Sequence, residues 1–479
     1  MESTSKKPSF SISLLIVAFL FVIIIAQLVV IGSPDIHMTL VFSITFAVLL
    51  LMMTGTKWSD VEDGIMHGCK IATVPMLILM FIGMLIPALI AAGTIPMLIY
   101  YGLQIINPSV FLLTAALVCS VASMCTGSSW TTGGTFGVAF MGISIGLGIP
   151  PALTAGAVVS GAVIGDKLSP LSDSTNLAAG VCETNLFAHI KSMLYTTVPA
   201  FVVSLVLYAV LGAKYSASSI DTSAVDTILA GISQNFNVTP LYSIISLIPL
   251  IVVIILAVKQ VSALAAMVVA SIIAMILAMI TQGYTVLEMM SFMNYGFTIE
   301  TGVEAVDTLM NRGGIQSMMW TVSLGYLGLS YGGILEKTGT LEALLDKMEG
   351  LTKNARNLII THLFSSIIIN FISASQYVAI IIPGRMYLPA YKKLGIRSDV
   401  ASRTCEDSGT VTSPLVPWGL CGVFFTGALG VSTMEYLPYA FLCYLTPIVA
   451  IIYASTGKFI WKEDTAKNDK IDAVKNAVK

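Results

Sequence analysis

Long apolar blocks separated by short polar connections run from one end of the chain to the other. One such block, SISLLIVAFLFVIIIAQLVVI, occupies 11–31, and another fills 251–280 apart from a Lys259-Gln260 turn. A helix of about 20 apolar residues crosses a hydrocarbon core roughly 30 Å thick. A helix also satisfies its own backbone hydrogen bonds there. The pattern therefore predicts an all-α polytopic membrane protein with a single integral membrane domain over 1–479.

Eight continuous apolar blocks and two broken ones give about ten predicted crossings. The continuous blocks lie at 11–31, 38–55, 71–90, 193–213, 241–258, 261–281, 315–334 and 436–457, and the broken ones at 152–183 and 398–430. The first block is predicted to be a span, because it is too long for a signal-peptide core and lacks a small-residue cleavage site. Lys6, Lys7 and the lysine-rich tail at 459–479 place both termini in the cytoplasm by the positive-inside rule.

Two further apolar stretches, at 109–147 and 357–383, are interrupted at their centres by small polar residues. The interruptions are TGSSW at 126–130 and SASQY at 373–377. Two half-length helices around such a tip favour a re-entrant hairpin. Two short spans would instead reverse the sides on which the later loops lie, so the Lys and Arg residues of those loops would no longer gather in the cytoplasm. Polar ligands at these tips are Thr126, Ser128, Ser129, Ser373, Ser375 and Gln376. The alternative is that small residues there only permit close helix packing.

Short matches at nearly one offset indicate an internal repeat. TGSSW matches SASQY, and LGI at 147–149 matches LGI at 394–396. In the same order, SPL at 169–171 matches SPL at 413–415, and AGT at 92–94 matches TGT at 338–340. The charge-based path opens the two hairpins on opposite sides of the membrane. The chain is therefore predicted to hold two inverted-topology repeats, at about 38–213 and 285–458, each with one hairpin and one broken helix. That layout is typical of secondary transporters working by alternating access.

Composition narrows the function classes further. Asp, Glu, Lys and Arg make up 10% of the chain, against about 25% in soluble domains. The net charge of −2 and the lack of a basic patch argue against nucleic-acid binding. Seven cysteines without C-x-x-C spacing and four scattered histidines predict no metal centre and no disulfide framework. No H-E-x-x-H motif is present, so we expect neither an enzyme nor a resident cofactor.

The first broken block contains the most polar segment of the apolar region, GDKLSPLSDSTN at 165–176. Gly165 and Pro170 oppose a continuous helix, and unwound backbone at membrane depth is tolerated where it lines a cavity. Asp173 with the neighbouring oxygens of Ser172, Thr175 and Asn176 predicts a cage for Na⁺, with Asp166 as a second ligand or a proton-binding group. Two structural alternatives stay open: Lys167 neutralises Asp166, or Ser172–Asn176 merely caps a helix.

The second broken block contains RTCEDSGTVTSPLVPW at 403–418. Glu406 and Asp407 lie upstream of its prolines and do not align with the aspartates of the first block at the 244-residue offset of the SPL triplets. Arg403 precedes Asp407 by one helical turn, so the two side chains can pair. The pair and Glu406 are therefore candidates either for gating and proton coupling or for a structural ion pair.

Three segments together resemble the NhaC family of bacterial Na⁺/H⁺ antiporters: TGSSWTTGGTFGVAF at 126–140, GDKLSPLSDSTNLAAGV at 165–181 and SRTCEDSGTVTSPLVPW at 402–418. The resemblance covers most of the chain. It implies site residues Asp166, Ser172, Asp173, Thr175 and Asn176 in the first break, and Glu406, Asp407, Thr412 and Ser413 in the second.

The resemblance also implies an activity, exchange of Na⁺ for H⁺ across the cytoplasmic membrane of a bacterium. The same family includes Na⁺- and H⁺-coupled exchangers of malate for lactate, and the motifs do not separate the two activities. Expected partners are therefore Na⁺, H⁺ and the lipid bilayer, with malate and lactate as the alternative substrates. A channel is less consistent with an inverted repeat. The sequence leaves open whether the chain forms a homodimer.

Overall fold

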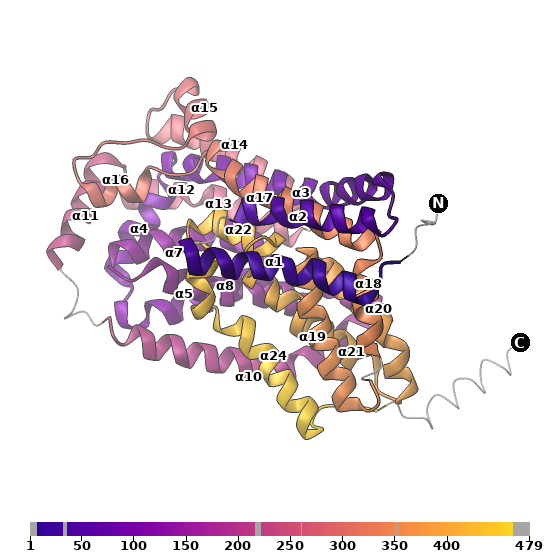
Figure 1. Cartoon of the computed structure of the whole chain (residues 1–479). Helices are drawn as coiled ribbons and strands as arrows, with labels where there is room; N and C mark the ends of the chain where they lie inside the picture. Colours follow the sequence, from indigo (N-terminus) through magenta and orange to yellow (C-terminus); the bar gives the residue numbers. More distant parts are fainter. Residues whose placement is uncertain (1–6, 32–35, 216–221, 260, 350–351, 463–479) are drawn as a thin grey trace, which may run out of the picture.

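A computed structural model describes residues 7–31, 36–215, 222–259, 261–349 and 352–462. Helices build this part of the chain, and its only β pairing is an isolated bridge between Ile396 and Lys462. Figure 1 shows the long helices α1, α2 and α10 running along one direction, with α11, α15 and α16 at one end of the bundle. The predicted all-α polytopic fold is confirmed.

The first half of the chain contains twelve α-helices in the described residues. They are α1 (Phe10–Ile31), α2 (Ile36–Met53), α3 (Trp58–Ala91), α4 (Thr94–Ile105), α5 (Phe111–Thr126), α6 (Ser129–Thr132), α7 (Val138–Gly146), α8 (Pro151–Leu168), α9 (Asp173–Val181), α10 (Leu186–Gly212), α11 (Thr222–Asn235) and α12 (Pro240–Ser246). A π-helical turn at Gly133–Gly137 joins α6 to α7.

The second half begins with α13 and ends with α24. Its helices are α13 (Ile248–Val258), α14 (Ala263–Thr281), α15 (Val286–Tyr295), α16 (Glu304–Met310), α17 (Met319–Lys337), α18 (Thr340–Glu349), α19 (Ala355–Ser373), α20 (Gln376–Lys393), α21 (Ser398–Cys405), α22 (Leu420–Leu429), α23 (Thr433–Tyr436) and α24 (Phe441–Thr456). A π-helical turn at Glu406–Thr410 follows α21, and a 3₁₀ turn at Ser413–Leu415 precedes α22.

Eight described helices are long and apolar enough to cross a membrane, or up to ten spans if each bent pair counts as one. The number agrees with the predicted crossings, but the identity of the spans differs in part. Pro108–Thr126 and Ala355–Ser373, predicted as half-length hairpin arms, are long and apolar enough to span, whereas the block predicted at 315–334 is not among the eight described candidates. Three predicted boundaries are wrong. The third span does not begin near 71, because α3 starts at Trp58 and continues for 34 residues through Pro75 and Pro87. The span predicted at 193–213 begins at Leu186, and the block predicted as continuous over 436–457 is bent by 54° between Tyr439 and Phe441. The polar loops also hold helices of their own, α11 in one and α15 with α16 in the other. The C-terminal tail beyond 462 lies outside the described residues.

Both predicted hairpins are helix–turn–helix units with a left-handed residue at the tip. Gly127 has φ 69° between α5 and α6, and Ala374 has φ 58° between α19 and α20. Gly127 has a second constraint, since a Cβ there would lie 2.7 Å from the Cβ of Leu171 in the first break. The first hairpin tip is thus packed directly against the broken helix. Re-entrance into the membrane stays a prediction.

Helix boundaries recur along the chain at an offset of 247 residues. The run 129–146 through α6 and α7 corresponds to α20 at 376–393, and α8 at 151–168 corresponds to the helical run 398–415. The next helices begin at Asp173 and Leu420, again 247 apart. The predicted SPL pairing, 244 apart, is therefore wrong: the first triplet lies in the break after α8, whereas the second is the last turn before the break at 416–419. On these boundaries we propose the two-repeat organisation.

Small residues let α5 approach α8 closely. Ser123 donates through Oγ to the carbonyl of Gly161 at 3.3 Å, and the N–H of Gly165 donates to the same Oγ at 3.0 Å. A Cβ at Gly165 would lie 2.2 Å from the carbonyl oxygen of Ser123. Backbone atoms cannot yield as a flexible side chain can, so glycine is required at this contact. The close packing of α5 against α8 holds the first hairpin beside the first break.

We expect Gly165→Ala to destabilise the protein by about 1–3 kcal/mol, because the added methyl group forces α5 and α8 apart. The measurement is thermal unfolding of purified protein in detergent, followed by circular dichroism. Gly180→Ala is the matched control, since a Cβ at Gly180 in α9 meets nothing within 4 Å. Equal unfolding temperatures for the two variants would contradict the close contact.

Candidate functional site

A cavity of about 670 Å³ brings the first break together with both hairpin tips. Asp166 and Asp173 line it from the break, Thr126 and Ser128 from the first tip, and Gln376 and Tyr377 from the second. Apolar residues of α3 and of the α13–α14 connection complete the wall, among them Ile71, Pro75 and Ala263. Segments more than 200 residues apart in the sequence thus meet around two carboxylates.

Asp166, in the last turn of α8, is buried and held by the first hairpin tip. The N–H of Ser129 donates to its Oδ1 at 2.7 Å, and the hydroxyl of Ser129 donates to its Oδ2. In the described part of the chain, Asp166 forms no ion pair with a basic side chain. The possibility that Lys167 neutralises Asp166 is therefore wrong, because Lys167 pairs with Asp407 instead. A carboxyl group with hydroxyl and amide donors but no fixed cation can take up a proton or a metal cation.

The hydroxyl groups after the break converge on the backbone carbonyl of Asp166. Ser172 and Ser174 each donate to it at 2.8 Å, and Thr175 donates at 2.6 Å. These oxygens satisfy a carbonyl that the end of α8 leaves without a helical partner. Ser172 also accepts a hydrogen bond from the N–H of Thr175, so its predicted alternative role as the N-cap of α9 is confirmed.

Asp173 and Asn176 point in other directions than the hydroxyl cluster. Asp173 is exposed to the cavity, and its Oδ2 accepts a hydrogen bond from the Tyr377 hydroxyl at 2.7 Å. Asn176 turns back and donates to the carbonyls of Pro170 and Ser172. Among the five consecutive side chains at 172–176, the three hydroxyl groups therefore contact the carbonyl of Asp166. Asp173 instead contacts the second hairpin, and Asn176 contacts its own turn. Their role as Na⁺ ligands stays a prediction.

The remaining tip residues mainly stabilise their own turns. Thr126 donates to the carbonyl of Ser128, and Ser373 donates to the carbonyl of Ser375. Ser128 caps α6 by accepting from the N–H of Thr131. The Oγ of Ser375 is buried and has no hydrogen-bond partner in the described residues.

Two contacts of α22, one at each hairpin tip, were not anticipated from the sequence. The thiol of Cys421 in α22 lies 3.5 Å from Oε1 of Gln376. Trp130, next to the first tip, stacks on Phe424 of the same helix with ring centroids 4.8 Å apart. Both contacts place α22, the second half of the second broken helix, against the hairpin tips. No local sequence signal announces them.

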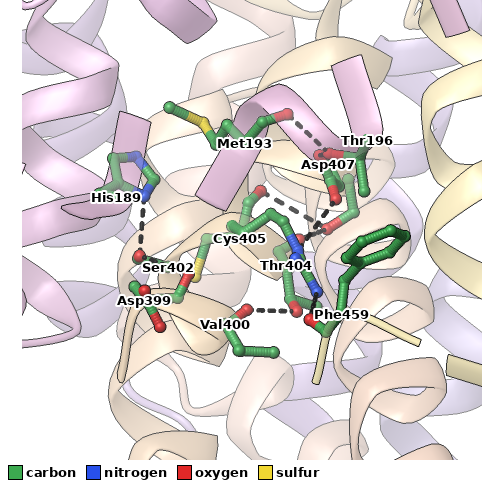
Figure 2. A network of polar contacts seen from close by, with 12 residues as sticks. His189, Met193, Thr196, Asp399, Val400, Ser402, Thr404, Cys405, Asp407 and Phe459 are labelled. Carbon is green, nitrogen blue, oxygen red and sulfur yellow. Dashed lines mark hydrogen bonds and ion pairs between the residues drawn. The ribbon is translucent and has the colours of Figure 1, made fainter. Parts of the chain in front are cut away.

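The acidic residues of the second break form a separate, buried cluster. Lys167 and Asp407 are both 0% exposed and form an ion pair between the two breaks. Thr196 of α10 donates to the same carboxylate oxygen at 2.8 Å, and Nε of Arg403 lies 3.9 Å from the other. The predicted Arg403–Asp407 pair is confirmed. Figure 2 shows Asp407 between Thr196 and the residues of α21.

Glu406 in the π-helical turn, with Thr412 and Ser413 just after it, has a different set of hydrogen-bond partners from Asp407. Glu406 is fully buried, and neither of its carboxylate oxygens has a hydrogen-bond partner in the described residues. Thr412 donates to the carbonyl of Ser408 at 2.5 Å and accepts from Asn370, whereas Ser413 Oγ has no hydrogen-bond partner among the residues that the structure describes. The described lining of the 670 Å³ cavity includes none of Glu406, Asp407, Thr412 and Ser413. The two breaks are therefore chemically different.

Two buried histidines have partners that explain them structurally. Nδ1 of His189 lies 2.7 Å from the hydroxyl of Ser402 (Figure 2), and Nδ1 of His362 lies 3.2 Å from the hydroxyl of Tyr391. These contacts link α10 to α21 and α19 to α20. The histidines thus join helices rather than line the cavity.

Comparison with known proteins gives matches over nearly the whole chain. A model of the Na⁺/H⁺ antiporter family matches residues 3–175 and 161–458. The Na⁺/H⁺ antiporter NhaC of Alkalihalophilus pseudofirmus is 37% identical over 97% of this chain and 99% of its own. The malate-2H⁺/Na⁺-lactate antiporter of Bacillus subtilis is 37% identical over 96% of this chain and 97% of its own. The arginine/ornithine antiporter ArcD of Halobacterium salinarum is 35% identical over 98% and 96%.

Proposed function

The chain belongs to the Na⁺/H⁺ antiporter family, and from that premise we propose that it exchanges Na⁺ for H⁺ by alternating access at the cavity of Asp166 and Asp173. It is a multi-pass membrane transporter and not an enzyme. The finer proposal concerns which residues carry the ions. The observation that supports it is the meeting of two carboxylates and both hairpin tips around one cavity.

The chemistry of the cavity suits a hard cation that alternates with a proton. Oxygen atoms are the ligands that such cations take, and carboxylates with carbonyl and hydroxyl oxygens supply them here. Asp166 has no fixed cationic partner in the described residues, so a bound Na⁺ or a bound proton neutralises it at membrane depth. The two occupants exclude each other because they compete for the same carboxylate oxygens. Exchange rather than co-transport follows from that competition.

Alternating access requires that the cavity walls move relative to one another. Asp173 and Tyr377 join the first break to the second hairpin through one hydrogen bond, which a sliding motion can break and remake. Buried packing contacts such as Gly165 against Ser123 move as a unit. We place the protein in the bacterial cytoplasmic membrane with both termini in the cytoplasm, on the charge bias of its loops.

The experiment uses purified protein in liposomes that contain a pH-sensitive dye. A pulse of external Na⁺ should alkalinise the lumen without any organic acid present, because Na⁺ that enters is exchanged for H⁺ that leaves. The same pulse is then given with malate on one side and lactate on the other. A response to Na⁺ alone supports Na⁺/H⁺ exchange, whereas a strict requirement for the organic acids would replace it with carboxylate exchange.

A further inference from the structure

A second cavity, of about 710 Å³, lies where α15, α16 and the end of α22 meet. It shares no lining residue with the Asp166 cavity. Polar side chains are spread around its wall: Thr308, Asn311, Ser317, Thr321, Thr426 and Ser432. The charge bias of the loops places this end of the bundle on the outer side of the membrane. Neither the family resemblance nor the Na⁺ site accounts for this cavity.

Arg312 is the one charged residue in the described lining of this cavity. Its side chain is half-buried, and within the described residues it forms neither an ion pair nor a side-chain hydrogen bond. The nearby acids are already engaged, since Asp307 accepts from the N–H and hydroxyl of Thr301, and Glu435 accepts from Ser432. The Arg312 guanidinium therefore has N–H donors that no described residue uses. These donors face a polar cavity whose described lining contains no carboxylate.

The backbone around Arg312 is fixed even though its side chain is not paired. Its carbonyl accepts from the N–H of Phe297 at 3.2 Å, and the N–H of Gly314 donates to the carbonyl of Gly83 in α3 at 2.6 Å. Gly313 and Gly314 both have positive φ, which allows this tight path. The loop thus holds Arg312 in place at the cavity wall. A positioned arginine without an acidic partner is a preformed anion-binding group.

A purely structural role for Arg312 would be to cap the C-terminus of α22. A Cβ on Gly430, just after that helix, would lie 3.9 Å from Nη2 of Arg312, yet in the described part of the chain the guanidinium donates to none of the helix carbonyls. A role in binding Na⁺ is also excluded by sign, because the positive charge repels a cation. An anion explains together the arginine, the hydroxyl groups and the lack of a carboxylate among the described residues that line the cavity.

We propose that this cavity binds a small carboxylate through a two-point contact with the Arg312 guanidinium. Arginine matches a carboxylate with two parallel N–H···O bonds, which a monatomic anion cannot use. The hydroxyl groups and the Asn311 amide then hydrogen-bond to other oxygens of the ligand, and Trp320 and Phe297 cover its carbon skeleton. The site goes beyond Na⁺/H⁺ exchange and does not depend on it.

The test follows the fluorescence of Trp320, which lines the cavity, as lactate, malate or chloride is added to purified protein in detergent. We expect saturable changes with lactate or malate, no comparable change with chloride, and loss of the signal in Trp320→Phe. Arg312→Gln should weaken carboxylate binding by about tenfold or more, and Arg312→Lys should weaken it less, because lysine keeps the charge but loses the fork.

Arg385→Gln is the matched control, since Arg385 lines a different cavity beside α9 and α20. It should leave carboxylate binding unchanged. Na⁺/H⁺ exchange without organic acid, measured in liposomes, checks that Arg312→Gln is folded. The proposal is overturned by equal responses to chloride and carboxylates, by the absence of saturable binding, or by unchanged affinity in Arg312→Gln. None of these outcomes bears on the Na⁺ site at Asp166.

Discussion

Asp166→Asn should reduce Na⁺-driven proton flux to the level of protein-free liposomes while leaving the protein folded. The amide keeps the size of the side chain and can still accept from Ser129, so the packing of α8 against the first hairpin is retained. It cannot bind a proton at transport pH and carries no charge to hold Na⁺. Both halves of the exchange therefore fail at once. The measurement is the pH-dye response to a Na⁺ pulse, with thermal unfolding as the check on folding.

Asp173→Asn provides the second arm of this experiment. Asp173 lines the same cavity and is held by Tyr377, so we expect Na⁺-dependent flux to be lost here too. Asp226→Asn is the matched control, because Asp226 is exposed on α11 and is not among the residues that line the cavity. Normal transport by Asp173→Asn with loss in Asp166→Asn would leave Asp166 as the only carboxylate ligand. Normal transport by both variants would move the ion site elsewhere.

Asp407→Ala should destabilise the protein by about 3–5 kcal/mol, because it leaves Lys167 charged and buried without its partner. Both side chains are 0% exposed, so water cannot replace the lost carboxylate. Arg403 and Thr196 lose the same partner. The measurement is the free energy of unfolding in detergent with increasing denaturant. The effect should exceed that of any exposed ion pair in the chain.

Lys392→Ala is the exposed comparison, since Lys392 pairs with Glu183 at the surface with 48% and 66% of the two side chains exposed. Such a pair contributes about 0–1 kcal/mol. A double variant, Lys167→Met with Asp407→Leu, removes both buried charges and should recover much of the stability. If the double variant folds and still exchanges Na⁺ for H⁺, the pair is structural. If it folds without exchanging, Asp407 and Lys167 take part in coupling.

The Lys167–Asp407 pair also connects the two broken helices directly. Lys167 lies in the last turn of α8 in the first half, and Asp407 lies in the π-helical turn of the second. The two breaks therefore cannot separate without exposing or re-pairing a buried charge. We infer that the two broken helices move together. The contact that breaks during transport is then the single hydrogen bond between Asp173 and Tyr377, which is weaker than the buried ion pair.

Sequence pattern alone predicted most of the architecture. Apolar block length decides which segments can span a membrane, and Pro170 marks the first break because proline does not suit a helix interior. The prediction that Gly165 interrupts the helix is wrong, because Gly165 lies within α8 and permits its close contact with Ser123. The polar tips at 126–130 and 373–377 could likewise be predicted, because small polar residues within a long apolar stretch indicate either a re-entrant turn or close helix packing. These are local properties of the chain, so they can be predicted without knowing which helices pack against one another.

The pairings inside the site were decided by the tertiary structure. Lys167 lies next to Asp166 in sequence but pairs with Asp407, 240 residues away, because adjacent side chains on a helix point in different directions. Ser129 binds Asp166 and Tyr377 binds Asp173 only because the hairpins fold back onto the first break. The 247-residue offset on which the proposed repeat rests came from helix boundaries rather than from the SPL match. Local spacing fixes where a chain bends, whereas long-range packing decides which charges meet.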